Sequence, residues 1–419
     1  MDVNKIKNGI EQLSSIGILP LIATLPFFFG KPQLISLYIA ATFYLLDLFV
    51  NKRWKEFSWS KNKIAYILFV ALFLMIPLRA LFDDYHSRQL STCVDRYLPF
   101  LIFGLIGIIG FAKKIQIKYV AWTMQLVVLY IFIKVLYITC GLDYEGFDEW
   151  IKLFTYIQHI KINSHMVVNM YLNFTLIISA YTLLHINLSK TLQYTTLLCM
   201  IIIVFLIIVS NGRAGVIGLL LNSFILISYY LLKKNKKHFA YFAIIYSIIA
   251  IGVIANKDKF HSPSMSDNPR LHIWSLCTDM IKERPIWGYG ICSARKEFVE
   301  RGLNSEDFYS HYAIEIVTDA KLKNKEPDFN VMHPHNAFLE VWMQVGILGV
   351  LLLIATLFSI TQLKLGIKQL YLNLCLLAFL VQMMFESFGS HLQPLYLCLM
   401  VIIFHYSTKE EKTLAKWNK

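Results

Sequence analysis

The 419-residue sequence is too apolar for a soluble protein: 57% of its residues are hydrophobic and only 16% are charged. The mean hydropathy is +0.54, and a soluble chain of this length needs far more polar surface to cover its core. The net charge of +13 would suggest nucleic acid in a soluble protein, but Lys and Arg here gather between apolar runs. We therefore expect an all-α polytopic membrane protein, with membrane lipids and not nucleic acid around it.

Apolar runs of about 20 residues recur along the chain, which is the length that a bilayer core about 30 Å thick requires. We predict twelve transmembrane helices, at 12–30, 33–50, 64–82, 97–112, 119–140, 165–185, 193–210, 214–232, 239–255, 337–360, 369–386 and 392–406. The first residues show no signal-peptide cleavage pattern, so we expect the first run to remain as a helix.

The charges of the loops predict the orientation. With a cytoplasmic N-terminus, the inner loops hold roughly three times as many Lys and Arg residues as the short outer segments. Both termini are then cytoplasmic. A structureless loop of about eighty residues would be unusual, so we expect a folded unit with short helices in the large periplasmic loop 256–336. The chain thus divides into residues 1–255 with nine spans, this loop, and residues 337–419 with three spans and a cytoplasmic tail.

The first candidate site is the stretch from Ser210 to Gly215 (SNGRAG), which lies between two spans with almost no loop. Arg213 is expected at the head of a helix at the outer membrane boundary. Helix N-terminal amides beside a guanidinium can bind an anion, and charges at such depth often have a function. Gly212 and Gly215 would let a bulky head group approach the backbone. The alternative is that Arg213 only reaches the phospholipid head groups.

The second candidate lies in the large loop, at Asn268-Pro269-Arg270. Asn268 is a favourable N-cap and Pro269 suits the first helical position, so a helix of about three turns is predicted, ending before Pro285. Arg270 at its start is a second possible anion ligand. The alternative is an ordinary exposed surface arginine.

The third candidate is His333-Pro334-His335-Asn336, directly before the tenth predicted span. A histidine at a membrane–water boundary can act as a general base, because its pKa lies near working pH. Asn336 could cap the helix or bind a sugar hydroxyl. No HExxH motif and no third close ligand accompanies the pair, so a metal site is disfavoured. A structural histidine pair is the remaining alternative.

Lesser candidates lie on the same side. Glu386 is near the outer end of the eleventh span, with His391 after it, and an intramembrane carboxylate usually faces the bundle interior. Residues 163–165 lead into the sixth span. Cys277 and Cys292 share an oxidising compartment, which leaves a disulfide open.

The three main candidates all fall on the outer side under one topology that was derived independently of them. Two arginines and a histidine suggest a clamp for a diphosphate and a base. The sequence has no Walker loop, Rossmann fingerprint or DxD-like cluster, so nucleotide substrates are disfavoured.

Four motifs in this order resemble the O-antigen ligase family. They are Ser210–Ala214 heading a helix, Arg270–Trp274, Pro285–Gly290, and His333–Leu339 before a span. The stretch VWMQVGILGVLLL that follows also resembles the family's glycine-rich helix. The motifs cover about the central third of the chain.

This resemblance implies a GT-C type glycosyltransferase of the Gram-negative inner membrane, with a periplasmic active site. Such enzymes transfer polysaccharide from undecaprenyl diphosphate to lipid A-core oligosaccharide in lipopolysaccharide biosynthesis, by an inverting reaction without metal or other cofactor. His335 matches the family's catalytic histidine, and Arg213 and Arg270 match its diphosphate-binding arginines. His333 stands at a position that varies in the family, and Asn211 stands where Thr or Ser is common.

Three alternatives remain open at the level of sequence. An O-antigen polymerase shares the superfamily and the lipid carrier. A polysaccharide or lipid transporter would carry inward-facing charges along several spans, whereas the charges here concentrate at the outer boundary. A protein O-glycosylating transferase is the third. The sequence leaves the donor glycan, the acceptor sugar and the oligomeric state open.

Overall fold

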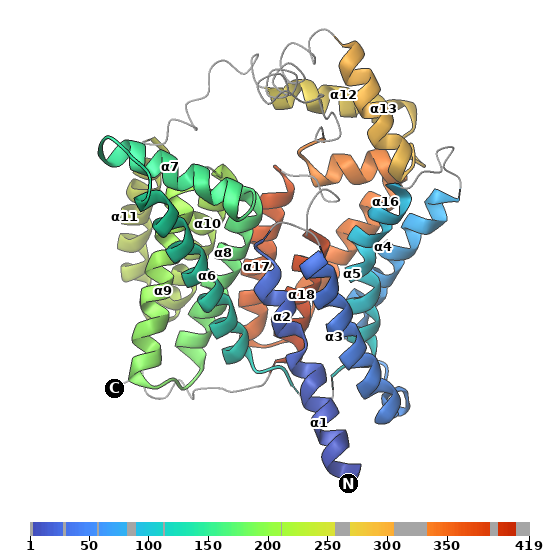
Figure 1. Cartoon of the computed structure of the whole chain (residues 1–419), viewed down its shortest axis with the longest axis horizontal. Coiled ribbons are helices and arrows are strands. Elements are labelled where there is room, and N and C mark those ends of the chain that lie inside the picture. Colours follow the sequence, from blue (N-terminus) through green and yellow to red (C-terminus); the bar gives the residue numbers. More distant parts are fainter. Residues whose placement is uncertain are drawn as a thin grey trace.

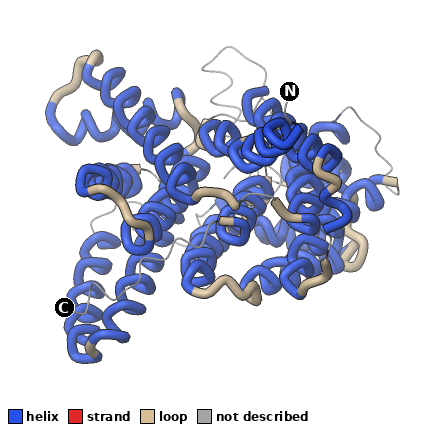
Figure 2. Tube along the Cα trace, turned by 90° about the horizontal axis from the view of Figure 1, so that it is seen from below, coloured by secondary structure: helices blue, strands red, loops and turns tan. Residues whose placement is uncertain are grey.

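The protein is helical throughout the part of the chain that its computed structural model describes, which is residues 3–27, 31–56, 58–81, 89–111, 114–210, 212–255, 269–305, 333–385 and 393–407. Within these ranges the only β-type pairing is an isolated bridge between Ile115 and Ser407. Figure 1 shows a bundle of long helices with two shorter ones at one end, and Figure 2 shows the same helices from below.

The helices fall into three stretches of the chain. The first holds α1 (Val3–Ile16), α2 (Ile18–Thr24), α3 (Lys31–Val50), η1 (Arg53–Glu56), η2 (Lys61–Lys63), α4 (Ile64–Ala80), α5 (Gln89–Ile109) and α6 (Ile117–Cys140). The second holds α7 (Gly146–Lys161), α8 (His165–His185), α9 (Lys190–Val209), α10 (Arg213–Lys234) and α11 (Lys236–Ala255). The third holds α12 (Pro269–Glu283), α13 (Ile291–Asn304), α16 (Ala337–Thr361), α17 (Ile367–Met383) and α18 (Gln393–Tyr406).

Eight helices in the described residues are long and apolar enough to cross a membrane, and two shorter apolar helices lie at 367–383 and 394–406. Most bounds agree with the predicted spans within a few residues. The first predicted span, 12–30, is divided at Gly17 into α1 and α2. A Cβ atom on Gly17 would lie 3.0 Å from the Phe43 ring, so the chain packs closely on α3 at this point.

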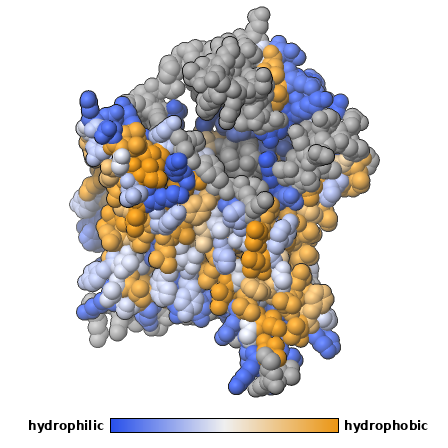
Figure 3. Space-filling view, in the orientation of Figure 1, coloured by the Kyte–Doolittle hydropathy of each residue, from blue (hydrophilic) through white to orange (hydrophobic). Residues whose placement is uncertain are grey.

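Burial differs sharply between the spanning helices. Most residues of α8 are buried, with Asn169, Asn173 and Thr182 inside the bundle, whereas no residue of α11 is buried. The exposed helix is the more hydrophobic of the two, with a hydropathy of 2.1 against 1.5. This inversion is expected where lipid and not water surrounds the bundle. Figure 3 shows hydrophobic residues over the side of the bundle and hydrophilic ones near α12 and α13, at α7 and at the start of α1.

Helices α12 and α13 come from the predicted large loop and pack on the beginning of α16. Their shared core contains the buried side chains of Ile273, Cys277, Met280 and Phe298, together with Met343 of α16. Cys277 is a free thiol, so it does not form the disulfide that the sequence left open. Burial is the main cause that raises the pKa of this thiol. The pair is therefore anchored to the spanning helices by apolar packing.

One end of the bundle collects the segments that carry the candidate site residues. Figure 1 shows α7, α12 and α13 at the same end. The hydroxyl of Thr155 in α7 donates a hydrogen bond of 3.3 Å to the carbonyl oxygen of Val209, the last residue of α9. The start of α10 therefore lies at this end too. We refer to it as the α12 end of the bundle.

Candidate functional site

The His motif, His333 to Asn336, forms a tight turn at the head of α16. His335 has a φ of 49°, in the left-handed region that non-glycine residues seldom occupy. Its backbone N–H donates to Nδ1 of His333 over 3.4 Å, and the two ring centroids are 3.9 Å apart. The Asn336 Oδ1 accepts hydrogen bonds from the backbone N–H groups of Phe338 and Leu339. The predicted cap is therefore confirmed, and it fixes the turn that presents both imidazoles.

Helix α12 contacts this turn through Trp274, and Arg270 lies on the same helix. The Trp274 Nε1 donates a hydrogen bond of 3.1 Å to the carbonyl oxygen of Pro334, inside the His motif. Arg270 lies one turn earlier on α12, and its guanidinium is 5.6 Å from the centroid of the Phe385 ring, just beyond α17. Pro269 begins α12, as predicted. Helix α12 thus contacts the His motif through Trp274 and the residue beyond the end of α17 through Arg270.

Three predicted candidates cannot be placed. Glu386 and His391 lie outside the described residues, and so does Asn268, the expected cap of α12. Phe385, directly before Glu386, is described and lies under Arg270.

The Pro285–Gly290 motif inserts its backbone into a kink of α16. The helix breaks at Gly346, which has a φ of 73° and a ψ of −170°. The break frees backbone groups of α16, and the motif satisfies them. The N–H groups of Tyr289 and Gly290 donate to the carbonyl oxygens of Met343 and Gln344, over 2.7 and 2.9 Å.

A third backbone bond completes this insertion, because the Ile347 N–H donates to the carbonyl oxygen of Pro285 over 3.0 Å. A Cβ atom on Gly346 would overlap the carbonyl oxygen of Ile286, so only glycine fits. The Trp342 Nε1 also donates to the Pro285 carbonyl, over 2.9 Å. The motif therefore locks α12 to the helix that carries His335.

Arg79 of α4 secures the same turn from the other side, a role that was not expected from the sequence. Its Nε donates to the carbonyl oxygen of Trp287 over 2.9 Å, and its Nη2 donates to that of Gly288 over 3.2 Å. A basic residue in the last turn of an apolar helix was the signal that could have drawn attention to it.

Arg213 belongs to a second group, built on α8 and α10. It is the first residue of α10, as predicted, and its side chain is exposed. Behind it the Ser210 hydroxyl and the Asn169 amide of α8 exchange two hydrogen bonds of 2.7 and 2.9 Å. Asn211 lies outside the described residues. The backbone geometry therefore presents Arg213 at the α12 end of the bundle.

The two glycines of this motif have a role other than the expected approach of a head group. A Cβ atom on Gly215 would lie 2.5 Å from Nδ2 of Asn169. One on Gly212 would lie 2.4 Å from the same nitrogen and 3.0 Å from the His165 ring. The space over both glycines is therefore occupied by α8. Asn169, which the sequence did not single out, and His165, a lesser candidate, form the packing surface.

Helix α17 separates the two groups and contacts both. It packs on α8 and α10 on one side and on α16 on the other. The helix that carries Arg270 contacts the His motif through Trp274, whereas Arg213 begins α10, which packs on α8. The site thus consists of two arms at the α12 end, with the end of α17 between them.

A polar row on the first turns of α16 adds residues that the sequence did not single out. Glu340 is buried and its Oε1 accepts a hydrogen bond of 3.3 Å from the Gln344 Nε2. The Gln344 Oε1 accepts one of 3.1 Å from the Tyr97 hydroxyl of α5. A carboxylate inside a predicted span was the available signal. Among the described residues, no three His, Cys, Asp or Glu side chains are grouped to hold a metal ion.

Comparisons with known proteins agree with the resemblance. The family model described as O-antigen ligase matches residues 198–354, which include α10, α12, α13 and the His motif. A protein of Rickettsia conorii named "Putative polysaccharide ligase" is 25% identical over 189 residues, which are 43% of this chain and 42% of that protein. One of Rickettsia prowazekii with the same designation is 25% identical over 166 residues, 38% and 37% of the two chains. The chain thus matches less than half the length of these relatives.

Proposed function

We propose that this chain, which is a member of the O-antigen ligase family through residues 198–354, is a glycosyltransferase that moves polysaccharide from undecaprenyl diphosphate to lipid A-core oligosaccharide. One observation carries the proposal. His335 has a φ of 49° and lies at the head of α16. Its turn accepts a hydrogen bond from Trp274, on the helix that carries Arg270. Backbone strain of this kind persists where the surrounding structure enforces it, and it concentrates at functional sites.

The reaction requires positive charge at the leaving group and a general base for the acceptor hydroxyl, and these side chains can supply both. The leaving group is a diphosphate, so the barrier falls when positive charge meets the negative charge that develops as the bond breaks. Arg213 and Arg270 supply planar guanidinium groups that suit phosphate oxygens. His335 takes the proton of the acceptor hydroxyl, whose oxygen then attacks the anomeric carbon from the face opposite the diphosphate. A single displacement of this kind inverts the anomeric centre and needs no metal ion.

The proposed topology places this chemistry in the periplasm. It has twelve spans in the inner membrane, both termini in the cytoplasm, and residues 256–336 outside. The α12 end is then the periplasmic face, and the hydrophobic carrier reaches the site sideways from the bilayer. Reporter fusions at Asn304 and at the C-terminus are expected to give opposite signals, and equal signals would overturn the arrangement.

The decisive experiment uses the purified protein in nanodiscs with undecaprenyl-diphosphate-linked polysaccharide. Lipid A-core oligosaccharide and a second lipid-linked glycan are offered as acceptors in separate reactions. Polymer attached to lipid A-core supports the ligase. A longer lipid-linked chain instead would identify a polymerase of the same superfamily, and no transfer to either would refute the proposal. A deletion strain is expected to lose polymer-capped lipopolysaccharide while it keeps the lipid-linked polymer.

A further inference from the structure

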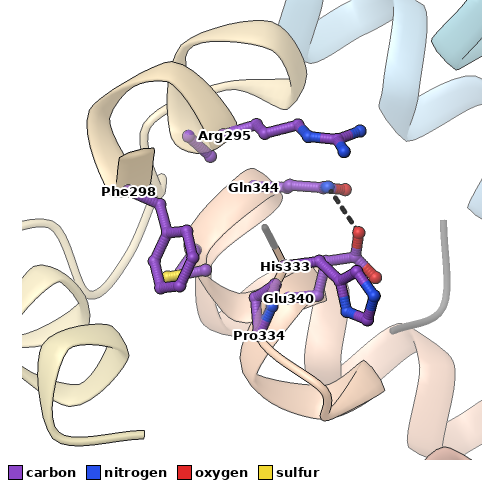
Figure 4. A pocket seen from close by; sticks show the side chains of 8 residues that line it. Arg295, Phe298, His333, Pro334, Glu340 and Gln344 are labelled. Carbon is purple, nitrogen blue, oxygen red and sulfur yellow. Dashed lines mark hydrogen bonds between the residues drawn. The ribbon is translucent and has the colours of Figure 1, made fainter. Parts of the chain in front are cut away.

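A small hollow, partly open to solvent, lies between α13 and the first turns of α16 (Figure 4). Its polar lining comes from Arg295, His333, Glu340 and Gln344, and Phe298 and Met343 form its apolar wall. None of the functions assigned above uses Arg295, Glu340 or Gln344. The pocket nevertheless shares His333 with the His motif, so it opens beside the proposed base.

The polar side chains of this pocket are held in defined orientations. Tyr97 donates to the Gln344 Oε1 and Gln344 donates to the Glu340 Oε1, so the amide is fixed with its nitrogen toward the carboxylate. Figure 4 shows the Arg295 side chain extended across the pocket above Gln344 and Glu340, with the His333 ring beside Glu340 on the other side. Both a donor and an acceptor therefore converge on the same space.

Sugar hydroxyls suit this arrangement, because each hydroxyl both donates and accepts a hydrogen bond. Glu340 accepts from them, while the Arg295 guanidinium donates and the Gln344 amide can do either. A diphosphate suits it less well. The positive charge of Arg295 is balanced here by the buried Glu340 carboxylate, whereas the proposed clamp offers an anion two arginines. The chemistry of the lining thus distinguishes the neutral acceptor sugar from the anionic donor group.

We propose that the pocket between α13 and α16 binds the acceptor sugar, with Arg295, Glu340 and Gln344 as its hydrogen-bonding residues. The inference rests on the proposed function, because it assigns one of that reaction's two substrates to a place. His333 and His335 are in ring contact, with centroids 3.9 Å apart, so a sugar in this pocket places a hydroxyl near the base. These residues position the acceptor, and the proton transfer remains with His335.

The test measures acceptor and donor dependence separately, for Glu340→Gln and Arg295→Ala in nanodiscs. The acceptor KM is expected to rise about tenfold in each variant, the effect of one lost charge-assisted hydrogen bond, while the donor KM changes less than about twofold. Binding of delipidated core oligosaccharide by calorimetry, with no donor present, is expected to weaken by the same factor. Thermal unfolding of each variant checks that it folds.

Tyr97→Phe is a milder variant that keeps the ring and removes only the hydroxyl donated to Gln344. Its acceptor KM is expected to rise about threefold, because the amide loses its fixed orientation. Lys296→Ala and Glu300→Gln are the matched controls. These residues lie on the same α13, pair with each other at 3.6 Å and are more than half exposed, so both KM values should stay unchanged.

Each failure has a distinct signature. A rise in the donor KM alone would assign the pocket to the donor and overturn the inference. Variants that behave like the Lys296 and Glu300 controls would remove the pocket from substrate binding and leave the proposed function standing. Absence of transfer by the wild-type protein would refute the function and, with it, the acceptor assignment.

Discussion

The two arms of the candidate site position their side chains in different ways. Arg213 begins a helix whose glycines pack directly on Asn169 of α8, so its place follows from close helix–helix contact inside the bundle. His335 stands on a strained turn that depends on hydrogen bonds from distant segments, through Trp274 and through the turn inserted at Gly346.

The difference shows what each arm tolerates. Helix packing through glycine depends on the absence of a side chain, so it should fail when a single methyl group is added. The inserted turn depends on backbone hydrogen bonds, so it should fail when the kink straightens. Functional loss from the first kind of damage should fall on Arg213, and from the second on His335.

The largest effect is expected on the His335 arm, at the proposed base. His335→Asn should lower the transfer rate by about 10²–10⁴-fold, because general-base assistance is lost. Asparagine tolerates a positive φ, so the turn and the thermal stability should be kept. Turnover of the purified variant and its binding of the lipid donor are the measurements. Near wild-type turnover would exclude His335 and direct attention to His333 or Glu386.

The pH profile of the wild-type protein sharpens the same point. The imidazole must be neutral to accept a proton, so the rate should fall as the pH drops through its pKa. His335→Asn should lose this acidic limb along with its activity.

Alanine substitutions of Arg213 and Arg270, one on each arm, allow the two arms to be compared directly. Arg213→Ala and Arg270→Ala should each lower kcat/KM for the donor by about 10- to 100-fold, the value of a hydrogen bond to a charged group. Lysine at either position should rescue only part of this loss, since a point charge lacks the bidentate geometry. Normal transfer by both alanine variants, at normal protein levels, would exclude the proposed role of the two arginines in binding the diphosphate.

Gly346→Ala tests the inserted turn. The added methyl group meets the Ile286 carbonyl, and alanine is strained at a φ of 73°, so unfolding free energy should fall by about 3 kcal/mol or more. Gly252→Ala on α11 is the control, since nothing lies within 4 Å of a Cβ there. Detergent melting of both variants is the measurement. Equal melting temperatures would show that the kink is not required.

Gly215→Ala tests the Arg213 arm in the same way, with a smaller effect. The methyl group would displace Asn169 from Ser210 and cost about 1–3 kcal/mol of stability. Gly218→Ala, three residues along the same helix, meets its nearest atom at an ordinary 3.4 Å and should be tolerated. Only the first variant should weaken donor binding. A similar loss in both would mean that helix α10 is sensitive throughout.

The smallest effect concerns the ion pair between Arg301 of α13 and Glu283 of α12. Arg301 donates hydrogen bonds to Glu283 and so, together with Tyr289, lowers the pKa of that carboxyl group to about 2. A carboxyl whose pKa is lowered by folding stabilises the fold above its unfolded pKa and loses this contribution as the pH falls toward 2. Because Glu283 is exposed, Arg301→Ala should change melting only slightly at pH 7, and the difference should vanish in acid. A difference that grows in acid would contradict this.

The spanning helices could be predicted closely from the sequence, because a bilayer requires apolar runs of fixed length with internally satisfied backbones. The helix starts at Arg213 and Pro269 and the cap at Asn336 could also be predicted, since each depends on a few neighbouring residues. Helix α7 lies between the predicted spans 119–140 and 165–185 and was not among the predicted helices. Its first turn is acidic, and its apolar residues, such as Phe154 and Ile157, are buried only by tertiary contact.

What the sequence by itself determined is therefore local: an all-helical membrane bundle, the heads of its helices, and the residue types that can bind phosphate or accept a proton. Only the tertiary structure decided that Gly212 and Gly215 receive Asn169, that Arg79 holds the turn inserted at Gly346, and that Glu340 lines a pocket. These contacts join residues far apart in the chain. Periodicity and capping rules describe neighbours within a few residues, and so they carry no information about which backbone will fill a kink in another helix.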